Sequence, residues 1–142
     1  MPRKKTMGDI YADTTIHGRG GAVSTLRLLV DTGSSYTWVP SAVLSSLGIA
    51  PTAGLSFELA NGRVVRRPIA EVRVSILGRT ATRWIVFGRK RDAGLVGTDT
   101  LQGLLLDVDP TAHRLLPRRR AMAVSPRAVG WTKPPRRSRR RG

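Results

Sequence analysis

Short apolar runs separated by turn-forming residues recur along most of this chain, and their spacing constrains the fold strongly. Runs rich in branched or aromatic residues, such as Val23 to Val30 and Trp84 to Phe87, are too short to be typical helices. Glycine- and asparagine-containing turns separate them, as in His17 to Gly21 and Ala60-Asn61-Gly62. Strands of this length at close intervals predict an all-β fold with one or two short helices.

The same reading places individual elements along the chain. A hairpin is expected over residues 9–30, and Trp38-Val39-Pro40 is expected to be extended. Ser41 to Leu47 predicts a short helix with Ser41 as N-cap and Gly48 as its end. Further strands are predicted at Leu55 to Leu59, Arg63 to Val74, Trp84 to Phe87 and Leu95 to Gly97, a helix at Thr98 to Gln102, and a last hairpin from Leu104 to Leu116.

Charge divides the chain into three parts. Residues 118–142 carry ten Lys and Arg and no acid, and Arg3, Lys4 and Lys5 add three cations at the start. Subtracting these 13 from the net charge of +16 leaves +3 for residues 6–117. We therefore expect a flexible basic arm at 1–8, one folded domain at 9–117, and a disordered Arg-rich tail at 118–142.

The basic tail leaves two interpretations open. Arginine clusters bind nucleic acid or anionic surfaces by charge alone, without reading sequence. The same residues also serve simply to keep a protein soluble. The sequence favours neither interpretation over the other.

Composition excludes several kinds of site. The chain has no Cys, which excludes disulfides, Cys-ligated zinc and a thiol nucleophile, and its two His, His17 and His113, lie far apart. Asp107 and Asp109 beside Pro110 predict a solvated turn rather than a metal site, so no metal or cofactor is expected. There is no apolar run of membrane-spanning length and no signal-peptide pattern, so a cytoplasmic location is expected by default.

Asp31-Thr32-Gly33-Ser34 directly follows the apolar run Leu28-Leu29-Val30 and supplies the clearest chemistry. Two carboxylates about 3 Å apart share one proton, so that one activates a water while the other polarises a peptide carbonyl. Gly33 lets its amide reach the Asp31 carboxylate, and the Ser34 hydroxyl is expected to donate to the outer carboxylate oxygen. Thr32 is expected to bond across to a partner loop.

Leu29 to Ser34 resembles the active-site segment of the retropepsin-like aspartic proteases, in their bacterial and cellular form. Phe57 to Gly62 resembles the flap region of that family, Leu95 to Leu101 its apolar-apolar-Gly segment and helix, and Leu104 to Leu116 its closing strands. The resemblance implies a closed acid-protease half-barrel over residues 9–117. It also implies a flap with Ala60, Asn61 and Gly62 at its tip, and Leu95, Val96 and Gly97 packed beside the catalytic loop. Thr98 stands where retroviral members carry Arg.

Asp-Thr-Gly occurs once in the chain, so a two-carboxylate site requires a second copy. The leading hypothesis is a homodimeric aspartic endopeptidase that cleaves a peptide or protein substrate with Asp31 from each chain. Two alternatives were weighed against it: an inactive protease-like module that binds peptides or dimerises, and a nucleic-acid-binding protein acting through the tail.

Overall fold

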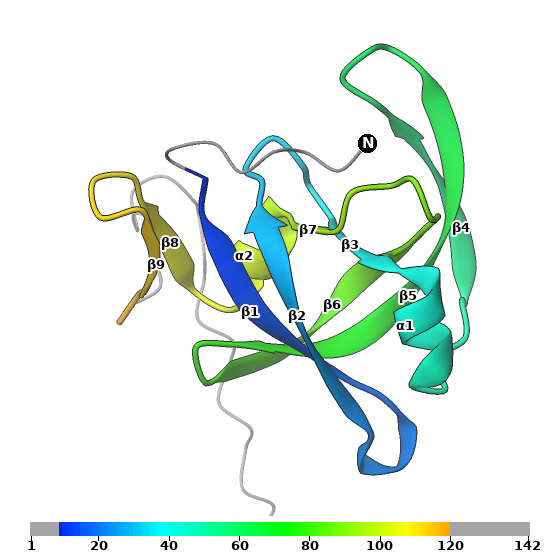
Figure 1. The fold of residues 1–142 in the computed structure, drawn as a ribbon, viewed down its shortest axis with the longest axis horizontal. Helices are drawn as coiled ribbons and strands as arrows, with labels where there is room; N and C mark the ends of the chain where they lie inside the picture. Colours follow the sequence, from blue (N-terminus) through cyan, green and yellow to red (C-terminus); the bar gives the residue numbers. More distant parts are fainter. Residues whose placement is uncertain (1–8, 120–142) are drawn as a thin grey trace, which may run out of the picture.

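The computed structural model of the protein describes residues 9–119, and its strands form one large sheet and one small sheet (Figure 1). Two short α-helices and one 3-10 turn join them. The elements are β1 Tyr11–His17, η1 Arg19–Gly21, β2 Val23–Val30, β3 Thr37–Pro40, α1 Ser41–Ser46, β4 Ala53–Glu58, β5 Val64–Ile76, β6 Arg79–Gly88, β7 Leu95–Val96, α2 Thr98–Gly103, β8 Leu106–Asp109 and β9 Arg114–Pro117.

The large sheet closes on itself. Its strand order is β1-β2-β7-β3-β6-β5-β4, and β1 also pairs with β5, so six strands form a ring from which β4 projects. The sheet is mixed, because β2 runs parallel to β7 and β3 parallel to β6, while the other pairs are antiparallel. The prediction of a mostly β fold with a ring-like sheet and one or two short helices is confirmed.

Two apolar clusters lie on opposite faces of this sheet. The larger one fills the ring and includes Ile16, Val39, Val74, Ile85 and Val96, all completely buried. The smaller one lies under the β4–β5 hairpin, where Trp38, Ile69 and Val86 are buried with Phe57 and other side chains packed against them. Neighbouring residues of one strand, such as Ile85 and Val86, therefore serve different clusters because side chains alternate along a strand.

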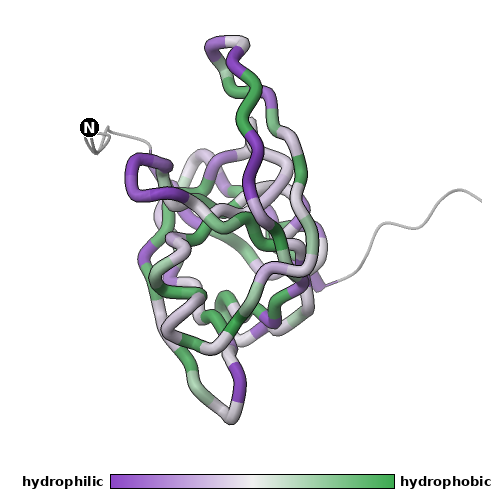
Figure 2. Tube along the Cα trace, turned by 90° about the vertical axis from the view of Figure 1, so that its right-hand side faces the viewer, coloured by the Kyte–Doolittle hydropathy of each residue, from purple (hydrophilic) through white to green (hydrophobic). Residues whose placement is uncertain are grey.

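Strand β5 passes from the ring into the projecting hairpin. Its buried positions are even-numbered from Ala70 to Ile76, and they change to Ile69 and Arg67 in the outer half. Ile69 and Ala70 are both buried, so the two faces of the strand are covered at that point. Figure 2 shows the hairpin extending beyond the ring, with hydrophilic residues at its tip.

Several local predictions are corrected. Ser41 is the first residue of α1 rather than its N-cap, because Pro40 occupies the cap position and the Ser41 hydroxyl donates to the Gly88 carbonyl at 2.9 Å. Strand β6 begins at Arg79, before the predicted Trp84, because the tight turn at Gly78 (φ 76°) pairs β6 with β5 along its length. Gly48 (φ 73°) follows the end of α1, as predicted.

The chain after α2 forms the predicted last hairpin, β8–β9. Arg118, counted with the tail above, lies against this hairpin: its amide donates to the Leu105 carbonyl at 2.7 Å. The predicted arm at 1–8 and the tail from residue 120 onward lie outside the described residues. Among residues 9–119, no helix has the length and apolarity needed to cross a membrane.

Candidate active site

The Asp31 loop links β2 to β3 and crosses the end of β7, which lies between these two strands. The Asp31 amide donates to the Val96 carbonyl at 2.9 Å, and the Ser34 amide returns to the Asp31 carbonyl at 3.1 Å. These bonds make a tight turn that presents the half-exposed Asp31 side chain outward. The Gly33 amide lies 2.9 Å from Asp31 Oδ1 and donates to it, the arrangement expected from the sequence.

Ser34 does not contact the carboxylate in the way expected. Its hydroxyl donates to the Tyr36 carbonyl at 2.8 Å and so stabilises the loop itself. The Ser34 carbonyl accepts the amide of Thr98, at the start of α2, at 2.9 Å. The side chain therefore holds the shape of the loop, and the prediction that it donates to Asp31 is corrected.

Leu95, Val96 and Gly97 lie directly beside the loop. Leu95 and Val96 pair with Leu29 and Val30 of β2, and Leu95 also pairs with Trp38 of β3. A β-carbon added at Gly97 would lie 2.4 Å from the Tyr36 carbonyl oxygen and 2.8 Å from that of Ser34. Glycine is therefore needed at position 97 for close approach of two backbones.

A buried pair of threonines under the loop was not predicted. The Thr37 hydroxyl lies 2.6 Å from the Thr100 hydroxyl and accepts the Gly97 amide at 3.0 Å, and both threonine side chains are completely buried. The one sequence signal was two threonines at inward-facing positions of a strand and a helix. Their pairing joins segments 63 residues apart, which local patterns do not reveal.

The predicted flap is a hairpin with a three-residue loop. The Leu59 amide donates to the Arg63 carbonyl at 2.8 Å, and the Gly62 amide donates to the Leu59 carbonyl at 2.9 Å. Gly62 has φ 82°, and Asn61 Oδ1 accepts the Arg63 amide at 3.0 Å. Ala60, Asn61 and Gly62 thus form the tip, and this tip is exposed.

A cleft of about 430 Å³ separates the flap hairpin from the Asp31 loop. Its floor is aromatic: the Phe57 ring packs edge-on to Tyr36 at 5.8 Å and lies 5.1 Å from Trp38, measured between ring centroids. The cleft is lined by Asp31, Gly33, Ser34, Ser35, Tyr36, Trp38, Leu55, Ser56, Phe57, Glu58, Leu59, Ala60 and Leu95. Of the predicted site residues, the cleft brings together Asp31, Gly33, Ser34, Ala60 and Leu95, while Thr32 lines a separate hollow beside α2. The others, Asn61, Gly62, Val96 and Gly97, are not part of the cleft lining.

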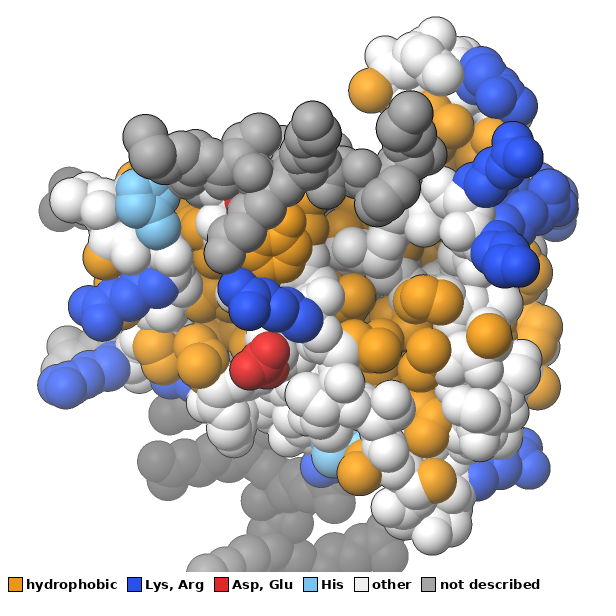
Figure 3. Space-filling view, in the orientation of Figure 1, with side chains coloured by type: hydrophobic (Ala, Val, Ile, Leu, Met, Phe, Trp, Pro, Cys, Tyr) orange, Lys and Arg blue, Asp and Glu red, His pale blue; other side chains and the backbone are white. Residues whose placement is uncertain are grey.

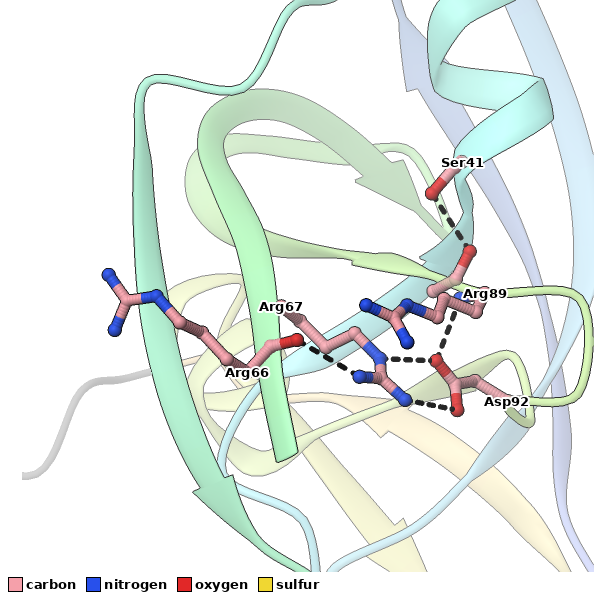
Figure 4. Close-up of polar contacts among 6 residues, drawn as sticks. Ser41, Arg66, Arg67, Arg89 and Asp92 are labelled. Atoms are coloured by element: carbon pink, nitrogen blue, oxygen red, sulfur yellow. Dashed lines mark hydrogen bonds and ion pairs between the residues drawn. The ribbon is translucent and has the colours of Figure 1, made fainter. Parts of the chain in front are cut away.

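Three acidic residues near the site form ion pairs with arginines. Arg67, buried beneath the flap hairpin, donates two hydrogen bonds to Asp92, at 2.7 and 3.1 Å, and these bonds hold the pKa of Asp92 below its usual range (Figure 4). Arg83 binds Asp99 at 2.8 Å. Arg118 binds Asp107 and lowers the pKa of Asp107 in the same way.

Asp107 and Asp109 lie in strand β8, Asp109 at its end where the turn to β9 begins. Asp109 Oδ1 accepts the amides of Thr111 and Ala112 at 3.0 and 3.2 Å, while Asp107 is paired with Arg118. Within residues 9–119, no three His, Asp or Glu side chains are grouped so as to hold a metal ion.

Comparison with known proteins agrees with this geometry. The sequence profile of a family described as aspartyl protease matches residues 12–100, well over half of the chain. That match runs from β1 into α2 and includes the Asp31 loop, the flap hairpin and Gly97. No curated protein matches the chain. The chain belongs to the aspartyl protease family, in its retropepsin-like group.

Proposed function

We propose that the protein is an aspartic endopeptidase whose active species is a homodimer, with Asp31 of each copy forming the catalytic pair. The observation that carries this proposal is the position of Asp31. Its carboxylate is held by the Gly33 amide at the mouth of a cleft that the flap hairpin covers. A peptide lying in that cleft would pass over the carboxylate.

The proposed reaction is hydrolysis of the peptide bond by water. The ionised carboxylate of the pair takes a proton from water as the water oxygen attacks the peptide carbonyl carbon. The protonated carboxylate donates its proton toward the carbonyl oxygen, which gives a neutral tetrahedral diol. Proton transfer to the amide nitrogen then lets the carbon–nitrogen bond break, releasing a carboxylic acid and an amine.

The pairing of the other acids supports the dimer. Within one chain, Asp99 and Asp107 are the other candidates for a second catalytic carboxylate, and each is bound by an arginine. Thr32 is exposed beside Asp31 and lines a hollow with Gln102 and the partly exposed Leu105. A second copy meeting this face would bring the two Asp31 loops together across a twofold axis.

Glu58 is the second carboxylate lining the cleft among the described residues. It extends from β4 near the flap tip, where no glycine amide is placed to hold it as Gly33 holds Asp31. If Asp31 of each copy forms the catalytic pair, Glu58 is not needed for the chemistry. Glu58→Gln is then a matched control for Asp31→Asn, because both changes convert one cleft carboxylate to an amide.

The test measures cleavage of a mixed peptide library by the full chain, with and without a pepstatin-type inhibitor. Asp31→Asn is expected to reduce cleavage at least about 10³-fold, as loss of an essential group does, while Glu58→Gln keeps it within about threefold. Circular dichroism checks that both variants are folded. Undiminished cleavage by Asp31→Asn would contradict the assignment as an aspartic protease. Loss of cleavage in Glu58→Gln alone would show that Glu58, and not Asp31, is the catalytic carboxylate.

A further inference from the structure

Exposed cations lie along the flap hairpin, from its tip at Arg63 downward, and in a loop tied to the hairpin. Arg63 and Arg66 belong to the hairpin, and Arg89, Lys90 and Arg91 follow one another in the loop between β6 and β7. Figure 3 shows Lys and Arg side chains along the edge of the molecule formed by β4 and β5. The three consecutive cations of the loop, residues 89–91, are called here the basic loop.

The Arg67–Asp92 pair anchors the basic loop to the hairpin. Asp92 accepts Arg67 Nε at 2.7 Å and also the Arg89 amide at 2.7 Å, so one carboxylate closes the loop and ties it to β5 (Figure 4). The Arg67 side chain is 9 % exposed. Arg66 points to the other side of β5 in Figure 4. The basic loop, by contrast, is held on the side of β5 where Arg67 meets Asp92.

This anchor places the basic loop at one end of the cleft. Arg67 stands opposite Leu55 in the β4–β5 pairing, and Leu55 lines the cleft. Leu95, three positions after Asp92, lines the cleft from β7. The basic loop is therefore tied, through Asp92 and Arg67, to the part of the hairpin that carries Leu55, next to the cleft but outside its lining.

The three cations of the basic loop are followed in the chain by one acid, Asp92. Asp92 is neutralised by Arg67. Glu58, the acid of the flap wall, lies three residues from Leu55, about 10 Å along the strand. Glu58 is thus about one screening length from the Leu55 end at physiological salt, and Arg63 lies close to it at the flap tip, so the positive charge of the basic loop acts chiefly at the Leu55 end.

From this arrangement we infer that the cleft selects peptides with acidic side chains, Asp or Glu, on the segment that leaves it past Leu55 and the basic loop. The inference rests on the proposed function in assuming that peptides occupy the cleft. It adds the substrate class: peptides with acidic residues flanking the scissile bond, on either side, because the twofold axis of the proposed dimer places one basic loop at each end of the cleft. Attraction of this kind acts on encounter and binding, so it raises kcat/KM through KM and leaves kcat unchanged.

The test uses pairs of peptides with one neutral, cleavable core flanked on a single side by Glu-Glu-Glu or by Gln-Gln-Gln. In 50 mM salt the wild-type full chain should cleave the Glu form about tenfold more efficiently than the Gln form, whichever side of the core carries the Glu residues, and 0.5 M salt should remove most of that preference. The variant Lys90→Glu/Arg91→Glu should lose or reverse the preference while cleaving the Gln form normally. Arg89 stays unchanged because its positive charge acts on Asp92, so that a carboxylate in its place would disturb the Asp92 anchor.

The matched control is Arg19→Glu/Arg73→Glu, which changes the net charge by the same amount. Arg19 lies in η1 at the end of the β1–β2 hairpin, which Figure 1 shows at the opposite end of the molecule from the flap tip. Both variants keep the Arg-rich tail, so its contribution cancels. The control should keep the Glu preference, and an equal loss in both variants would overturn the inference in favour of overall charge.

Binding separates failure of the inference from failure of the proposed function. Affinities of the same fluorescent peptides for the Asp31→Asn protein, measured by anisotropy, should show the same Glu preference. If no peptide is cleaved but this preference exists and depends on the basic loop, the inference stands and the protease assignment fails. Equal affinities for the Glu and Gln forms overturn the inference. The inference is also overturned if Lys90→Glu/Arg91→Glu weakens binding of a single-stranded DNA 20-mer but leaves the ratio of the affinities for the Glu and Gln peptides unchanged.

Discussion

The Thr37 hydroxyl lies 2.6 Å from the Thr100 hydroxyl beneath the Asp31 loop, and neither side chain is reached by solvent. Because Thr37 Oγ1 also accepts the Gly97 amide, three segments meet at one atom: β3, the end of β7 and α2. The loop that presents Asp31 is therefore held by a polar contact inside an otherwise apolar core. Such contacts are costly to break because the groups left behind are already out of water.

Thr37→Val should lower the free energy of unfolding by about 2 kcal/mol, since the Gly97 amide and the Thr100 hydroxyl lose their partner while the side-chain volume is kept. Urea unfolding measures this change. Thr100→Val should cost less, because the Thr37–Gly97 bond remains. A loss below about 0.5 kcal/mol in Thr37→Val would show that this contact does not hold the loop.

Gly97→Ala should abolish most peptidase activity and lower stability, because its methyl group would meet the Tyr36 carbonyl carbon and oxygen at 2.6 and 2.4 Å. Gly94→Ala is the matched control. Its nearest neighbour would be the end of the Leu28 side chain at 3.0 Å, which can rotate away. Activity and thermal unfolding of the two variants check the comparison, and equal behaviour would contradict the close approach at position 97.

Asp92→Asn should destabilise the protein by about 1–3 kcal/mol at pH 7, because it leaves buried Arg67 without its charged partner. The Arg67 hydrogen bonds lower the pKa of Asp92 in the folded state, so this stabilisation is present above about pH 4. It is lost as the pH falls through the lower folded-state pKa. The unfolding free energies of wild type and Asp92→Asn should therefore approach each other as the pH falls further below the ordinary pKa of an aspartate.

Asp107→Asn is the control for that pH dependence. Its partner is Arg118, and both side chains are well exposed, so water screens the pair. A much smaller change in unfolding free energy is expected. A loss in Asp107→Asn equal to that in Asp92→Asn would show that burial of Arg67 is not the cause.

Cleavage should follow a bell-shaped pH profile on the acidic side, since one carboxylate of the pair must be charged and the other protonated. Ser34→Ala should leave the acidic limb of that profile in place, because the Ser34 hydroxyl donates to the Tyr36 carbonyl rather than to Asp31. Initial rates from pH 3 to 9 measure both. A shifted acidic limb in Ser34→Ala would indicate that the hydroxyl turns to the carboxylate in the active enzyme.

The parts of the fold that were predicted depend on neighbours in sequence. The hairpin turn at Asn61-Gly62, the end of strand β2 at Val30, just before Asp31, and the glycine after α1 each follow from local backbone preferences. The full length of β6 was missed, since residues 79–83 alternate small, polar and charged side chains and extend only because β5 pairs with them.

The parts of the site that were missed depend on pairs distant in sequence. Arg67 occupies an inward position between Val65 and Ile69 of β5, which marks it as unusual but does not name Asp92 as its partner. Thr37 and Thr100 are similar, because a buried threonine has several ways to satisfy its hydroxyl. The Ser34 hydroxyl was predicted to donate to the Asp31 carboxylate. The sequence does not reveal that the loop brings the Tyr36 carbonyl within 2.8 Å of the same hydroxyl.

The peptidase activity of wild-type protein mixed with Asp31→Asn protein tests the central claim most directly, because one chain supplies one Asp-Thr-Gly. In a ninefold excess of the variant, with subunits exchanging freely, only about one wild-type subunit in ten meets another wild-type subunit. Activity per wild-type subunit should then fall to about one tenth, while the same excess of an unrelated basic protein has no such effect. Unchanged activity per wild-type subunit would contradict the account, because each chain would then hold a complete catalytic site of its own.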